Sequence, residues 1–204
     1  MELREIRPGL VRWTARHPEA EAEPEPESPA DSPPDVGSVA YEAPDAFVFV
    51  DPLVPSETEA FWASMDERVR RHGQRVVVLT TIAFHRRSRD EVVERYGAST
   101  SRARRTLPAG VETFPVRRAG EVMVWLEEHR ALVPGDRILG DGRGGVRLCP
   151  ESWLRYLPSG MKFPELRDAL RPLLELPVEM VLVSHGEPVL AEGRAALARA
   201  LDSG

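Results

Sequence analysis

The pattern of apolar and polar positions predicts strands first, then a mixture of strands and helices. Residues 3–15 read as two short strands around a Pro8-Gly9 turn, and 38–43 and 46–51 as two more around Pro44-Asp45. Apolar residues at helical spacing between 58 and 73 predict a helix that ends at Gly73. The β-branched run at 75–81 is typical of a buried strand, and a helix at 89–97 follows it.

The second half of the chain repeats this order. Strand patterns at 113–118, 121–128, 130–140 and 145–150 precede a helix at 163–175, a strand at 178–186 and a last helix at 192–202. Two β-rich halves that each end in strand and helix predict sheets packed face to face with helices outside. The fold class is therefore α+β.

One segment departs from these patterns. Residues 18–35 are acidic and rich in proline, with too little apolar surface to offset the entropy of ordering them. We expect a loop or arm there, inside one domain that spans residues 1–204, because a chain of this length supports one sizeable core.

Composition removes several classes of function. No apolar run is long enough to cross a bilayer, and the N-terminus lacks the pattern of a secretory signal, so we expect a cytoplasmic protein without a membrane partner. The single cysteine, Cys149, excludes an internal disulfide and a multi-cysteine zinc site. A net charge of −6 argues against nucleic acid as a partner. The oligomeric state cannot be read from the pattern.

Two motifs that often indicate function do not support a nucleotide site or a serine hydrolase here. The letters G-x-G-x-x-G occur in "GDGRGG" at 140–145, but a strand pattern follows them, which favours a hairpin loop over a nucleotide site. No G-x-S-x-G elbow of a serine hydrolase is present.

Three side chains with metal-binding chemistry each follow a buried strand. His85 comes after the run at 75–84, Asp136 lies in the turn "VPGD", and His185 ends "VEMVLVSH". Side chains at the ends of neighbouring strands converge on one sheet edge, where two imidazoles and a carboxylate suit zinc, iron or manganese. Taken singly, each histidine also reads as a hydrogen-bonded cap and Asp136 as a turn residue.

The order of these landmarks resembles the metallo-β-lactamase superfamily over essentially the whole chain. The resemblance rests on the opening hairpins and on the segments "VFVDP", "VVVLTTIAFH", "LVPGD" and "VLVSHGEP". The resemblance implies a four-layer αββα sandwich, metal-dependent hydrolysis, and catalytic and metal-binding roles for His85, Asp136 and His185. It also places Asp51 where the family has an aspartate that orients a ligand, although an Asp before a proline equally starts a turn.

The family's metal motif H-x-H-x-D-H is largely missing. With Gly97 as the end of the helix that follows the motif, His85 takes the place of the last histidine. The other three ligand positions hold Thr80, Ile82 and Phe84, so the resemblance implies that the first metal site is absent and that the second has lost its motif aspartate.

Two functions remain open after this comparison. One is a hydrolase in which one divalent ion activates water toward an ester or thioester of a small molecule. The other is a catalytically inactive protein of the same fold, without metal, that binds a ligand or another protein. Arg86, Arg87 and Arg89 would favour an anionic ligand if a guanidinium lies beside the site, whereas a solvent-exposed arginine cluster, which also includes Arg102, Arg104 and Arg105, is the simpler expectation.

Overall fold

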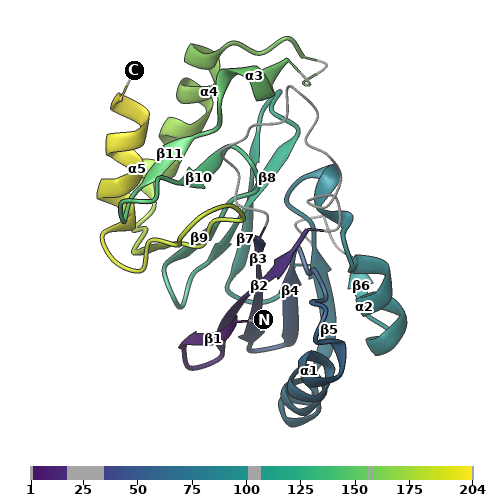
Figure 1. Ribbon diagram of the computed structural model, residues 1–204. Coiled ribbons are helices and arrows are strands. Elements are labelled where there is room, and N and C mark those ends of the chain that lie inside the picture. Colours follow the sequence, from purple (N-terminus) through teal and green to yellow (C-terminus); the bar gives the residue numbers. More distant parts are fainter. Residues whose placement is uncertain (1, 18–34, 101–106, 156, 158, 204) are drawn as a thin grey trace.

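The structure is a computed structural model that describes residues 2–17, 35–100, 107–155, 157 and 159–203 (Figure 1). The acidic segment predicted as a loop at 18–35 lies outside the described residues except for Asp35. That residue is the first of a strand, not the last of a loop, because its backbone pairs with Arg16 on the neighbouring strand.

The first sheet contains the strands from the N-terminal half. Its first four strands pair as antiparallel neighbours, and the last two join the sheet in parallel. In spatial order the strands are β1 (Glu2–Arg7), β2 (Leu10–Arg16), β3 (Asp35–Ala43), β4 (Ala46–Val50), β5 (Arg75–Leu79) and β6 (Ser99–Thr100). The helices of this half are α1 (Thr58–His72), the one-turn 3-10 helix η2 (Ala83–Arg86) and α2 (Arg89–Tyr96).

The second sheet is built from the later strands in the order β12-β9-β8-β7, with a separate hairpin β10-β11 beside it. These strands are β7 (Val111–Val116), β8 (Glu121–Leu126), β9 (Ala131–Val133), β10 (Ile138–Gly140), β11 (Val146–Leu148) and β12 (Met180–Val181). The helices of this half are α3 (Glu151–Leu154), α4 (Phe163–Leu170), the 3-10 helix η4 (Arg171–Glu175) and α5 (Gly193–Asp202).

Side-chain alternation along the strands produces the four layers. In β5, Val76 and Val78 pack with residues of α1 and α2, whereas Val77 and Leu79 pack against the second sheet. In β8, Trp125 faces the cluster formed with α4 and α5, and its neighbours face the first sheet. Figure 1 shows α1 and α2 outside one sheet and α4 and α5 outside the other. The predicted αββα sandwich is thus confirmed.

The glycine-rich segment 140–145 is the hairpin loop between β10 and β11, as predicted. The carboxylate of Asp141 accepts hydrogen bonds from the backbone N–H groups of Arg143 and Gly145. The segment therefore uses its own acidic side chain to close a turn. Among the helices of the described ranges, none has both the length and the apolar character that a bilayer crossing needs.

The predicted strand at 178–186 is much shorter than expected. β12 contains only Met180 and Val181, paired in parallel with β9. The following residues leave the sheet and bond to other segments: Ser184 O accepts from the N–H of Gly37, and His185 O accepts from the N–H of Gly140. His185 consequently lies on a connecting segment, not within a strand.

Strand direction places the candidate residues at one edge. β4 and β5 are parallel neighbours, and Asp51 and His85 follow their C-terminal ends. β9 and β12 are likewise parallel neighbours, and Asp136 and His185 follow theirs. Because the sheets pack face to face, these two pairs of ends meet at one rim of the sandwich.

Candidate metal centre

His85, Asp136 and His185 come together at this rim. Oδ1 of Asp136 lies 2.9 Å from Nε2 of His85 and 3.3 Å from Nε2 of His185. One donor atom from each of the three residues lies within 4.8 Å of the others. The prediction that these widely separated residues meet is confirmed, whereas their catalytic and metal-binding roles stay predictions.

Asp51 fixes the orientation of the His85 ring. His85 lies in η2, directly after β5, and its Nδ1 is 2.8 Å from Oδ2 of Asp51. Asp51 is held in turn by Thr81, whose backbone N–H donates to Oδ1 at 2.8 Å and whose hydroxyl donates to Oδ2. With Nδ1 directed at Asp51, Nε2 is the nitrogen that faces Asp136. Asp51 therefore has the orienting contact that the resemblance implied.

Asp136 is positioned by a carboxylate that the sequence analysis did not single out. Glu121 is buried at the start of β8, and its side chain accepts hydrogen bonds from the backbone N–H groups of Gly135, Asp136 and Arg137 at 2.8–3.0 Å. Gly135 fits only without a side chain, because a Cβ there would lie 2.8 Å from Oγ1 of Thr81. The turn that contains Asp136 is thus held by the hydrogen bonds to Glu121 and by close packing against Thr81.

His185 is enclosed by the β10 end and by α3. The indole of Trp153 meets its ring edge to face, with centroids 6.0 Å apart. Gly186 adopts a φ of +85° and lies against Gly140, where a Cβ would meet backbone atoms at 3.1–3.3 Å. His185 Nδ1 is buried and has no hydrogen-bond partner. The ring position is therefore set by packing and by its backbone.

The charges of the site are strongly coupled. Burial disfavours a charged His85, but the carboxylates of Asp51 and Asp136 outweigh this and raise the pKa of His85 to about 9. Burial alone would raise the pKa of Asp136, but the imidazoles of His185 and His85 hold it well below its ordinary value. Burial and the nearby Asp136 raise the pKa of Glu121 to about 7.

The donor set fits a divalent ion. Asp136 Oδ1 is buried and, despite its two imidazole neighbours, accepts no hydrogen bond of acceptable geometry. Two donors on one tetrahedral zinc ion lie about 3.4 Å apart. The separation of Asp136 Oδ1 from His185 Nε2, 3.3 Å, is close to this value, and that from His85 Nε2, 2.9 Å, is shorter. An orphaned carboxylate oxygen between two ring nitrogens is the arrangement that a bound cation satisfies. His85, Asp136 and His185 are the residues that would hold it.

The three substituted motif positions differ in their exposure. Thr80 and Ile82 are buried, and Ile82 forms a backbone bridge with Glu121. Phe84, at the place of the motif aspartate, is 77% exposed. It is the exposed large hydrophobic residue of the described ranges, so it lies at the surface beside the site.

The arginine cluster divides into two environments. Arg86 and Arg89 pair with the carboxylate of Asp90 at 2.8 Å; Arg86 is exposed, as expected, and Arg89 is partly exposed. Arg87 is the exception to that expectation, because its guanidinium is largely buried and bonds to backbone and side-chain oxygens near Asp51. Arg102, Arg104 and Arg105 lie outside the described residues.

The sequence did carry one signal for Glu121. Residues 121, 123 and 125 alternate in β8, and the last two are Met and Trp in the core, so a glutamate in phase with them must face inward. No comparable signal exists for Thr81, because a threonine at a strand end has many uses. His129 lies buried in the β8-β9 turn with its ring edge to face against Tyr41.

Comparisons with known proteins agree on the fold. No family model and no curated protein sequence matches the chain. Among solved structures, it is similar to VMB-1 with a TM-score of 0.64 and 12% identity, covering 98% of this chain and 94% of that one. It is also similar to a metallo-β-lactamase from Hirschia baltica (TM-score 0.61, 14% identity, 98% and 95% covered) and to the metallo-β-lactamase IND-7 (TM-score 0.61, 14% identity, 99% and 98% covered). The chain therefore has the metallo-β-lactamase fold.

Proposed function

We propose that the protein is a hydrolase that uses one divalent metal ion, held by His85, Asp136 and His185, to cleave an ester or thioester of a small molecule. The observation that carries the proposal is the convergence of their donor atoms within 4.8 Å around a buried carboxylate oxygen that lacks a hydrogen bond. The fold adds support, because solved proteins that share it are metallo-β-lactamases.

The ion would supply Lewis acidity and would lower the pKa of a water molecule at an open position. The chain's own residues prepare the site for it. Asp51 keeps the Nδ1 hydrogen of His85 engaged, so that the Nε2 lone pair is available to a ligand. Glu121 holds Asp136 in place through three backbone N–H groups. Three protein ligands leave coordination positions for water and a substrate oxygen, which is the pattern of a catalytic site.

The substrate class follows from this chemistry. Activated water attacks an electrophilic carbonyl carbon, and esters and thioesters have leaving groups that need less protonation than an amine does. A single ion also lacks the second cation that would stabilise a poor leaving group. We therefore place activated acyl esters and thioesters before amides. The small molecule's remaining chemistry, including any negative charge, is left to experiment.

Hydrolysis assays on the full chain test this proposal. Protein loaded with zinc, manganese or iron(II) would be incubated with a panel of aryl and alkyl thioesters and esters, and thiol or acid release would be followed. The proposal expects metal-dependent turnover of at least one ester or thioester that His185→Ala abolishes. Turnover that chelator-treated protein or His185→Ala retains at the level of metal-loaded wild type would refute it.

A second function is favoured by a different observation. Without metal, the positive charge of a protonated His85 lies between the Asp51 and Asp136 carboxylates at 2.8 Å and 2.9 Å, and this balance raises the pKa of His85 to about 9. A proton can thus occupy the place of a cation at neutral pH. In this alternative the protein is an inactive member of the fold, and the exposed Phe84 beside the site contributes to binding a ligand or protein.

Thermal unfolding separates the two functions. A ligand that binds only the folded state raises the unfolding midpoint. The hydrolase proposal expects a rise with zinc, manganese or iron(II) that chelator reverses. A midpoint unchanged by all three ions would favour the inactive alternative.

A further inference from the structure

The segment that carries His185 receives unusual support from the first sheet. β12 ends at Val181, and residues 183–186 belong to no strand of the second sheet. Their carbonyl oxygens therefore lack the hydrogen bonds that a neighbouring strand would give. Polar backbone groups at a buried rim need hydrogen bonds from elsewhere. In this chain Arg12 supplies hydrogen bonds to two of the carbonyls, and the N–H groups of Gly37 and Gly140 supply the other two. A second arginine, Arg87, bonds to the side chain of Ser184.

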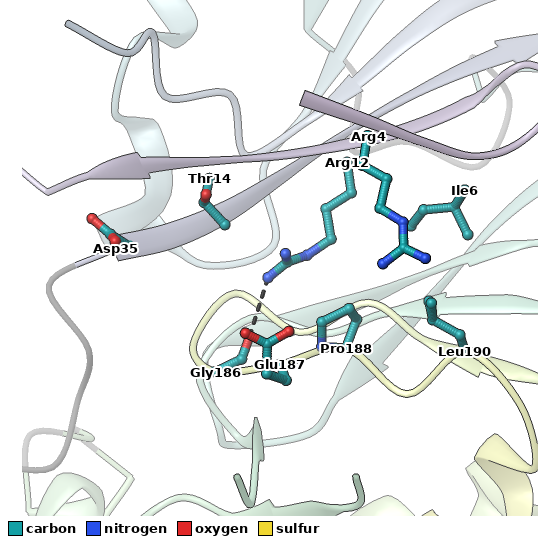
Figure 2. Close-up of a pocket in the computed structure, with 9 residues that line it drawn as sticks. All are labelled: Arg4, Ile6, Arg12, Thr14, Asp35, Gly186, Glu187, Pro188 and Leu190. Atoms are coloured by element: carbon teal, nitrogen blue, oxygen red, sulfur yellow. Dashed lines mark hydrogen bonds between the residues drawn. The ribbon is translucent and has the colours of Figure 1, made fainter. Parts of the chain in front are cut away.

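Arg12 of β2 contacts the segment from one side. Its Nη2 donates to the carbonyl oxygens of Val183 and Gly186, each at 3.2 Å. Figure 2 shows the side chain of Arg12 extending from the β1-β2 hairpin toward the turn at Gly186 and Glu187. The two contacts bracket His185 along the chain.

Arg87 contacts the segment from the side of the metal centre. Its Nη2 donates to Oγ of Ser184 at 2.6 Å, and its Nη1 donates to the carbonyl oxygens of Gly37 and Asp51, each at 3.0 Å. One guanidinium therefore joins the residue before His185 to the backbone of the residue that orients His85. Arg87 reaches this position with a φ of +39°, which is costly for a residue with a side chain.

We propose that Arg87 is a positioning residue, which sets the place of His185 relative to the Asp51-His85 pair. The inference deepens the proposed function, because it names what brings the two halves of the metal site into register. A planar guanidinium can reach three oxygens in fixed directions, whereas a lysine ammonium at the same place is a point charge on a flexible stem. The arginine shape is thus the property on which this role depends.

Charge and position make opposite predictions for Arg87. A guanidinium close to a cation site repels the cation, so its removal would strengthen metal binding if charge were its only effect. Loss of positioning would weaken metal binding instead. Arg87→Met removes charge and shape, and Arg87→Lys removes shape but keeps charge. Arg86→Met is the matched control, because Arg86 is the preceding residue and its guanidinium pairs with Asp90 at the surface.

The first arm of the test needs no metal. Long-range proton-nitrogen NMR spectra of chelator-treated, full-length protein report each imidazole, and His85→Ala and His185→Ala spectra assign the two rings. In Arg87→Met and Arg87→Lys, the His185 nitrogens should shift toward the values of a solvent-exposed histidine, while the His85 nitrogens, held by Asp51, should change little. Arg86→Met should match wild type.

The second arm measures cobalt(II) binding by its visible absorption and rests on the proposed metal site. Loss of a group that orients a ligand typically lowers affinity by 10–100-fold, and we expect a decrease of about this size in both Arg87 variants. Failure of wild type to bind cobalt would count against the proposed function alone, because the NMR arm would still decide on Arg87.

Ser184→Ala protects the test against a variant that does not fold. It removes the acceptor of the Arg87 Nη2 bond and leaves Arg87 in place, so the His185 signals should shift in the same direction by a smaller amount. The inference is overturned if folded Arg87→Lys, or folded Ser184→Ala in its place, keeps the wild-type His185 signals. Tighter cobalt binding in Arg87→Met, with wild-type binding in Arg87→Lys, would assign Arg87 a role through charge only.

Discussion

Oδ2 of Asp51 lies 2.8 Å from Nδ1 of His85, and both side chains are buried at the rim where the two sheets meet. The contact determines which ring nitrogen of His85 faces Asp136. It also raises the affinity of His85 for a proton, which a metal ion must displace.

Asp51→Asn should weaken zinc binding by about 10–100-fold. The asparagine oxygen can accept from Thr81 or from His85, but its NH₂ group cannot accept the remaining bonds that the carboxylate takes. Competition with a chromophoric chelator measures the affinity. Asp90→Asn, which alters an exposed carboxylate paired with Arg86, should bind like wild type. Equal affinities in the two variants would show that Asp51 does not orient His85.

Glu121→Gln should lower the free energy of unfolding by about 2–3 kcal/mol at pH 8. A buried carboxylate accepts three backbone hydrogen bonds, and an amide offers only one oxygen for them. Urea unfolding of metal-free protein measures the loss. The control is Glu112→Gln on the neighbouring strand, which is exposed and should change stability by less than about 0.5 kcal/mol. A loss of stability no larger than that of Glu112→Gln would show that the Glu121 carboxylate does not hold the turn at 135–137.

Metal-free protein should lose stability as the pH rises from 7 to 9. The pKa of His85 is raised to about 9 in the folded state from 6.5, so the folded state holds a proton that the unfolded state has released over this range. The contribution of His85 to the free energy of unfolding is therefore fully present below pH 6.5. It falls by about 2–3 kcal/mol between pH 7 and pH 9. The pKa of Glu121 is raised to about 7, so its titration changes the free energy of unfolding mainly below pH 7.

Urea unfolding at pH 7 and pH 9 in chelator checks the size of this fall. His85→Gln should remove most of it, since the variant has no imidazole to titrate. Saturating zinc should also flatten it, because a metal-bound imidazole carries no extra proton. A slope that persists in His85→Gln would assign the effect to another group.

Much of the fold could be predicted from side-chain periodicity. The runs predicted at 46–51 and 75–81 became β4 (Ala46–Val50) and β5 (Arg75–Leu79). Their residues alternate between helix-facing and sheet-facing clusters, as in a sheet that is buried on both sides. Gly73 and Gly97 end their helices in the left-handed conformation, as predicted. Ser88 occupies the N-cap position of α2 but does not cap it, because its hydroxyl accepts from the N–H of Val54.

The convergence of the three candidate residues was predictable from the sequence, whereas the residues that support them were not. His85, Asp136 and His185 follow strands whose ends share one rim, so the order of elements was enough to bring them together. The short β12 and the buried Arg87 were missed because both depend on bonds between the two sheets, at Gly37 and Ser184. Local patterns do not report contacts between residues so far apart in sequence.

Metal stoichiometry measures the central claim most directly. Full-length protein would be equilibrated with zinc at pH 8, freed of loosely bound ions, and analysed by mass spectrometry for metal per chain beside His85→Ala and His185→Ala. We predict one zinc ion per wild-type chain and a substantial loss in both variants. Wild-type protein that retains no zinc, or folded variants that retain as much as wild type, would contradict a metal centre at His85, Asp136 and His185.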